Sequence, residues 1–238
     1  MSGMQTAPYQ EFAREKLGFE FENIDYLITA LTHRSYVNEH KKSVTEHNER
    51  LEFLGDAVLE LVVTDYLFRN HSEPEGILTS WRASLVRTES IGEAGDNLGY
   101  EPLVRMSRGE KNGSTRARQQ ILANAFEALI GAMYLDAGYV KCQEFISTHV
   151  LSRLDDILEN QLFIDPKSRL QEHTQERFSI TPSYQVLSEE GPDHAKQFLV
   201  GVFLNEKEIA RGTGASKQSA QVSAAENALK ALAEQPEK

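Results

Sequence analysis

The chain has 238 residues, a formal net charge of −11 and a single cysteine. This length fits one large domain or two modest ones, and one cysteine excludes an internal disulfide and a cysteine-built zinc site. There is no uninterrupted run of about 18 apolar residues, so we expect no membrane span. The first residues lack the charged start and apolar stretch of a signal peptide. Together these features predict a cytoplasmic protein.

The charge is unevenly distributed along the chain. Residues 1–160 hold 16 Lys and Arg against 25 Asp and Glu, whereas residues 161–238 hold 9 against 11. This balance argues weakly against a simple polyphosphate-binding protein, because local basic clusters matter more than totals. One such cluster, either a phosphate-contacting loop or a solvated one, consists of Arg105, Arg108, Lys111, Arg116 and Arg118.

Only helices are predicted in the first 160 residues, because apolar residues recur there at spacings of three and four. Gly, Pro, Asn and Ser mark the gaps, and Gly138 stands where a helix C-terminal cap is preferred. The predicted helices cover residues 9–17, 23–31, 46–70, 76–100, 115–137 and 141–158.

The pattern changes type after the segment 160–168, in which Asp165-Pro166 is suited to start a new helix. We predict a helix over 167–178, then strands at 184–187, 198–203 and 207–211, then an Ala-rich helix over 216–233 opened by Gly212-Thr213-Gly214. The expected architecture is therefore multi-domain: an all-α domain over 1–160 followed by a small α+β domain of α-β-β-β-α order over 165–238.

Two nearly all-apolar segments each carry a polar pair at helical spacing. Glu52 and Asp56 share one helix face, as do Asn124 and Glu127, with about 5–6 Å between the Cβ atoms of each pair. If the two helices pack together, four oxygen-bearing side chains converge, and such hard ligands suit Mg²⁺ or Mn²⁺. Gly55 costs about 1 kcal/mol in a helix interior, which indicates close approach by another backbone, an ion or a ligand.

Several segments together resemble bacterial ribonuclease III. The segment Asn48-Glu49-Arg50-Leu51-Glu52-Phe53-Leu54-Gly55-Asp56 is similar to the signature of that family almost letter for letter. Supporting matches are Leu31–Ser35, Arg82–Val86 and Phe126–Ala132, and Gly212–Lys217 with the following helix resembles the end of a double-stranded-RNA-binding domain. The resemblance spans essentially the whole chain.

The resemblance implies a Mg²⁺-dependent endonuclease that homodimerises through its helical domain. Such an enzyme cuts double-stranded RNA to 5′-phosphate and 3′-hydroxyl ends and processes ribosomal and other structured RNA precursors, including messenger RNA. Metal-ligating positions of the family match Glu52, Asn124 and Glu127, and Asp56 and Glu127 match catalytic residues. Mn²⁺ is expected to substitute for Mg²⁺.

The family also implies an RNA-binding surface on the second domain. One minor groove would meet Gln171, Glu172 and Gln175, the next would meet Pro192 and His194, and Lys217 would meet phosphate. For the helix residues, the alternative is an ordinary solvated face. For His194, a structural or incidental role is equally compatible with the sequence.

Two positions depart from the family pattern. Asn124 stands where Asp is usual, so an amide replaces a carboxylate but keeps one oxygen ligand. Gln218 stands where a second Lys beside Lys217 is usual. The first departure leaves open a binding-only protein with silenced catalysis. A di-iron bundle is nearly eliminated, because no His lies three residues after a Glu.

Overall fold

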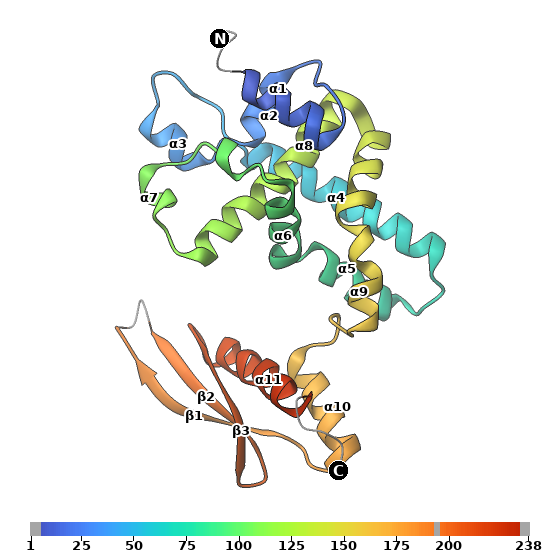
Figure 1. The fold of residues 1–238 in the computed structure, drawn as a ribbon, viewed down its shortest axis with the longest axis vertical. Helices are drawn as coiled ribbons and strands as arrows, with labels where there is room; N and C mark the ends of the chain where they lie inside the picture. The colour runs from blue at the N-terminus through green and yellow to red at the C-terminus, as the bar shows by residue number, and fades with distance from the viewer. Residues whose placement is uncertain (1–5, 193–195, 234–238) are drawn as a thin grey trace. The chain divides into compact units, whose positions relative to one another are not determined.

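The computed structural model describes residues 6–192 and 196–233, and the chain divides into two compact units between Phe163 and Ile164. Each unit is described by itself (Figure 1). None of the described helices combines the length and apolarity needed to cross a membrane. The first unit contains α1 (Ala7–Phe12), a π-helical turn (Ala13–Leu17), α2 (Ile24–Ala30), α3 (Arg34–Glu39), α4 (Glu49–Asn70), α5 (Glu75–Val86), α6 (Thr88–Leu98), a 3₁₀ turn (Glu101–Leu103), α7 (Arg108–Lys111), α8 (Thr115–His149), a second 3₁₀ turn (Leu151–Arg153) and α9 (Leu154–Glu159).

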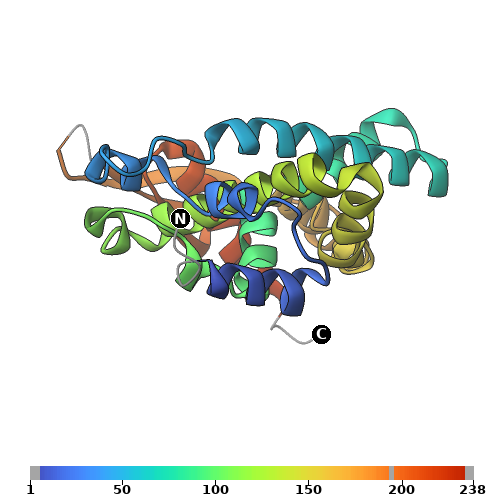
Figure 2. The same ribbon diagram turned by 90° about the horizontal axis from the view of Figure 1, so that it is seen from above.

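The first unit is all-helical, as predicted, and is organised around α4 and α8. These two helices make the most extensive contact in the unit, and Figure 2 shows α4 lying along α8. Helix α8 is buried on nearly every side from Ile121 to Met133, where Phe126, Leu129 and Ile130 are fully enclosed. A helix that is apolar on all sides is typical of a protein core, and α8 contributes many residues to the main hydrophobic cluster.

The backbones of α4 and α8 touch at two glycines. A Cβ on Gly55 would overlap the backbone carbonyl of Glu127 and lie 2.8 Å from the amide nitrogen of Gly131. A Cβ on Gly131 would in turn overlap the carbonyl of Leu51. The close approach expected at Gly55 is therefore made by another backbone, and only glycine fits at either position.

The predicted single helix over 76–100 is wrong, because α5 ends at Val86 and α6 begins at Thr88. Arg87 between them is extended, with φ −60° and ψ 150°. The Ser90 hydroxyl donates 2.7 Å to the carbonyl of Ser84 and so satisfies the end of α5. This local side-chain bond competes with helix continuation.

The other helical predictions differ from the structure in smaller ways or are confirmed. Helices α3 and α7 were not predicted; they have six and four residues, too short to show a period. Helix α4 begins at Glu49 rather than 46. Gly138, with φ 78° and ψ −175°, interrupts α8 where the sequence predicts a break.

The second unit is the predicted α-β-β-β-α arrangement. Its elements are α10 (Pro166–Phe178), β1 (Ser183–Glu190), β2 (Gln197–Leu204), β3 (Lys207–Gly214) and α11 (Lys217–Ala233). The strands form one antiparallel sheet in the order β1-β2-β3. Helix α11 packs on β2 and β3, and α10 packs on α11 (Figure 1).

The glycines at 212 and 214 belong to β3 and do not open the last helix as predicted. A Cβ on Gly212 would overlap the backbone of α11 at Ala224, and one on Gly214 would crowd Ser219. These glycines therefore let α11 lie close on the sheet. The buried core of this unit consists of Leu170, Val200, Val202, Ala220, Ala224, Ala225, Ala228 and Leu232.

Candidate functional site

The crossing of α4 and α8 brings together Glu52, Asp56, Asn124 and Glu127, which we call the oxygen cluster. Glu52, Asn124 and Glu127 are half-buried and Asp56 is exposed. Glu52 and Asp56 flank Gly55, whose backbone lies against the carbonyl of Glu127. The glycine contact between the helices therefore sets the separation between the two polar pairs.

Burial and like charge dominate the electrostatics of Glu127. Burial, followed by the charges of Asp56 and Glu52, raises the pKa of Glu127 to about 8. The carboxyl is therefore mostly protonated at neutral pH when no cation is bound. A bound cation would favour the charged form, so the cluster is suited to exchange a proton for a metal ion.

Glu52 shares this environment at the first turn of α4. Burial raises the pKa of Glu52, and the charges of Glu49 and Asp56 act in the same direction. A hydrogen bond with Asn124 opposes the rise by favouring the charged form. The side chains of α4 and α8 are thus in direct contact across the crossing.

The amide of Asn124 is held on both sides. Its Oδ1 accepts a 2.7 Å hydrogen bond from Nε2 of Gln120, one turn earlier on α8, while the side chain also bonds to Glu52. Within residues 6–192 and 196–233, no three His, Cys, Asp or Glu side chains are arranged to hold a metal ion by themselves. The amide of Asn124 and the carboxyls of the cluster all offer oxygen donors, and donors of both kinds fit a hard divalent cation.

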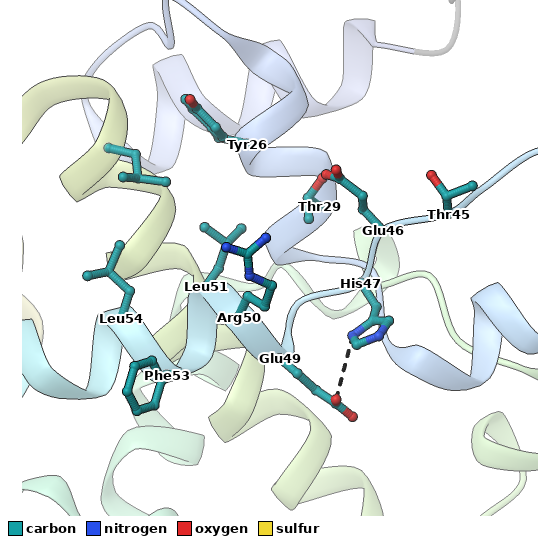
Figure 3. A pocket seen from close by; sticks show the side chains of 11 residues that line it. Tyr26, Thr29, Thr45, Glu46, His47, Glu49, Arg50, Leu51, Phe53 and Leu54 are labelled. Atoms are coloured by element: carbon teal, nitrogen blue, oxygen red, sulfur yellow. Dashed lines mark ion pairs between the residues drawn. The ribbon is translucent and has the colours of Figure 1, made fainter.

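A cavity of about 880 Å³ lies at the start of α4 (Figure 3), and none of the four residues of the oxygen cluster lines it. Glu49, whose charge contributes to the raised pKa of Glu52, does line the cavity. The remaining lining is largely apolar on one side, with Tyr26, Leu51, Leu54 and Leu135. Phe53 lies at the rim, and its side chain is 82% exposed.

The structure places the predicted RNA-contacting residues of the second unit on its surface. Gln171, Glu172 and Gln175 are exposed on α10, which leaves that face free for a ligand. Pro192 is exposed beyond the end of β1, and Lys217 is exposed as the first residue of α11. His194 lies outside the described residues.

One contact of Lys217 was not predicted. Its Nζ lies 3.1 Å from Oε1 of Glu189 on β1. Nothing in the sequence pairs these two residues, because they are 28 positions apart and meet only through the sheet and the start of α11.

The basic cluster before α8 is partly engaged within the first unit. Arg118 pairs with Glu101, and Arg105 stacks over the ring of Tyr36 at 4.4 Å. Lys111 and Arg116 are exposed near the N-terminus of α8. Two of the five basic residues therefore have partners within the unit.

Comparison with known proteins shows the family of the chain. Residues 23–154 match the family described as Ribonuclease-III-like. The chain belongs to the ribonuclease III family. Ribonuclease 3 of Oceanobacillus iheyensis is 42% identical over 219 residues, covering 92% of this chain and 96% of that protein. Ribonuclease 3 of Carboxydothermus hydrogenoformans is 44% identical over 222 residues, covering 93% and 94%.

A second family model matches the second unit, and a solved structure is similar to part of the chain. Residues 166–232 match the double-stranded RNA binding motif. The nuclease domain of the Campylobacter jejuni ribonuclease III is 40% identical with a TM-score of 0.52, and covers 60% of this chain and 94% of that one. That domain is described as having a region involved in dimer formation. A ribonuclease III nuclease domain and an RNA-binding domain thus follow each other in this chain.

The raised pKa of Glu127 predicts how stability depends on pH in metal-free protein. Because the pKa is higher in the folded state, the stability contributed by this group is present below about pH 4.5 and is lost as the pH rises through about 8. Glu127→Gln cannot ionise, so urea unfolding in chelator should show a smaller decline over this range. Glu15→Gln, at an exposed position, is the control. If the free energy of unfolding falls equally with pH in wild type and in Glu127→Gln, the raised pKa of Glu127 is contradicted.

Proposed function

We propose that this ribonuclease III family member is a Mg²⁺-dependent endonuclease that cuts double-stranded RNA, leaving 5′-phosphate and 3′-hydroxyl ends. Its substrates are ribosomal and other structured RNA precursors, its compartment is the cytoplasm, and Mn²⁺ substitutes for Mg²⁺. Residues 1–160 form the catalytic and dimerisation domain, and residues 165–238 form the RNA-binding domain. The observation that supports this most strongly is the oxygen cluster, in which burial and then the charges of Asp56 and Glu52 raise the pKa of Glu127 to about 8.

Within the cluster we assign metal binding to Glu52, Asn124 and Glu127, and catalysis to Asp56 and Glu127. A divalent cation held by these residues would lower the pKa of a bound water and offset negative charge on the phosphate. The residues of the chain supply the rest. Glu127 gives up its proton when the site is loaded, and exposed Asp56 is accessible to orient the attacking water.

The RNA-binding domain supplies most of the duplex affinity in this proposal. Gln171, Glu172 and Gln175 face one minor groove, and the segment with Pro192 and His194 faces the next. Lys217 contacts the phosphates between the grooves, where the N-terminus of α11 also favours an anion.

We also propose that the protein is a homodimer that joins through α4. Phe53, Leu61 and Phe68 lie on one stripe of this helix and are 82%, 57% and 78% exposed. Large exposed apolar side chains in a row mark an interaction surface. A second copy related by a two-fold axis would cover this stripe and offer its apolar cavity at the start of α4 to Phe53.

The dimer proposal predicts that Phe53→Ser lowers the dimer fraction at micromolar concentration in sedimentation velocity. Truncating a buried interface anchor typically costs about 2 kcal/mol or more, which is about a 30-fold weaker association. Phe178→Ser changes an exposed phenylalanine of the other unit and should leave association unchanged. Equal sedimentation of Phe53→Ser and wild type would contradict the assigned interface.

Asn124 sets the metal requirement in this account. It keeps an oxygen but lacks the negative charge that the family usually places there. At an effective dielectric constant of about 20, two unit charges about 4 Å apart interact by about 4 kcal/mol, part of which is offset by desolvation. The missing charge therefore weakens attraction to a divalent cation without removing the site.

Titrating Mg²⁺ against the cleavage rate of a long RNA duplex tests the role of Asn124. We expect Asn124→Asp to reach half-maximal rate at about fivefold or more lower Mg²⁺, since about 1 kcal/mol corresponds to that factor. Asn124→Ala, which also removes the oxygen, should cut more slowly than wild type. If wild type is inert at every Mg²⁺ concentration while Asn124→Asp cuts, the site is silenced and the protein only binds RNA. The names of the relatives, which are nucleases, give no support to that alternative.

A further inference from the structure

Glu189, near the end of β1, is paired with two lysines that come from different parts of the second unit. Oε1 of Glu189 lies 3.1 Å from Nζ of Lys217, and Oε2 lies 3.4 Å from Nζ of Lys196. Lys217 begins α11 and Lys196 directly precedes β2. One carboxylate therefore gathers two ammonium groups at a single point on the surface.

The ring of Phe198 on β2 forms the floor of this arrangement. Nζ of Lys217 is 5.7 Å from the ring centroid and Nζ of Lys196 is 6.0 Å from it. Cations over an aromatic face are favoured, so both lysines have a reason to stay near the ring when the carboxylate is absent. The two ammonium groups are thus a preformed anion site that Glu189 occupies.

The chemistry of that occupant resembles that of an RNA phosphate. Both present negatively charged oxygens that accept hydrogen bonds from ammonium groups. The hydrogen bonds from Lys217 and Lys196 hold the pKa of the Glu189 carboxyl below its usual range, so it remains charged at neutral pH. A phosphate approaching Lys217 therefore meets a like charge already in place.

We propose that Glu189 is an intramolecular competitor for the phosphate-binding lysines and limits how tightly the protein holds an RNA duplex. The inference rests on the phosphate contact of Lys217 in the proposed function. Glu189 places one negative charge beside the two lysines, and Glu189→Gln removes it. Binding of a duplex therefore requires the Glu189 carboxylate to be displaced from the lysines. This requirement weakens RNA binding that depends only on the charge of the phosphate backbone.

The test compares Glu189→Gln with Glu190→Gln in the full chain, with binding to a long RNA duplex measured in chelator so that no cutting occurs. Each variant removes one negative charge from adjacent exposed positions of β1, but successive side chains point to opposite faces of the strand. Glu189→Gln should bind about two- to fivefold more tightly than Glu190→Gln, the range expected for releasing exposed ion pairs. For this variant, the slope of the logarithm of the binding constant against the logarithm of the salt concentration should steepen by up to about 0.9 for each added phosphate contact.

A second set of variants separates this inference from the proposed function. In a background in which Lys217 and Lys196 are both changed to Gln, the gain from Glu189→Gln should fall to that of Glu190→Gln. Equal affinities of Glu189→Gln and Glu190→Gln in the wild-type background would overturn the inference alone, provided Lys217→Gln weakens binding. Unchanged binding by Lys217→Gln would overturn the phosphate role itself. Urea unfolding of all variants confirms that folding is retained.

Discussion

The backbone contact between α4 and α8 is the constraint on which the rest of the first unit depends. Gly55 lies against the carbonyl of Glu127, and Gly131 lies against the carbonyl of Leu51. Any side chain at either glycine would push the helices apart. Because Glu52 and Asp56 stand on either side of Gly55, the same contact that closes the core also brings the carboxyls of α4 to Glu127.

This closeness has an electrostatic consequence. Burial, and then the nearby charges of Asp56 and Glu52, raise the pKa of Glu127 to about 8. Replacing charged groups at such a site by apolar residues is often neutral or stabilising, so packing alone does not account for these carboxyls. The proposed cation site does account for them. In the second unit opposite charges meet instead, because Glu189 pairs with both Lys217 and Lys196.

Sequence alone predicted the elements whose signals are long or local. The periodic stretches of α4 and α8, the break at Gly138 and the order of strands in the second unit are all present in the structure. The close approach at Gly55 followed from the cost of glycine in a helix interior. The separation of α5 from α6 did not, because it depends on the Ser90 hydroxyl reaching the carbonyl of Ser84.

The sequence pattern did not predict the individual contacts between segments that are distant in the chain. Glu52 and Asn124 were expected to converge only if their helices packed together, and the hydrogen bond of Gln120 to Asn124 was not anticipated. The pairing of Glu189 with Lys217 depends on the sheet register and on where α11 begins. The catalytic and RNA-contacting roles themselves still rest on resemblance to the family and on the geometry of the cluster.

The most direct measurement is a comparison of Gly55→Ala with Gly76→Ala for urea unfolding and for Mg²⁺-dependent cleavage of duplex RNA. Gly76 in α5 has open space where a Cβ would stand, so its alanine variant should be unchanged or up to about 1 kcal/mol more stable and should cut normally. Gly55→Ala should lose about 1–3 kcal/mol or more and lose cleavage, because α4 and α8 must separate. A Gly55→Ala protein that unfolds and cuts like Gly76→Ala would contradict the claim that this contact builds the site.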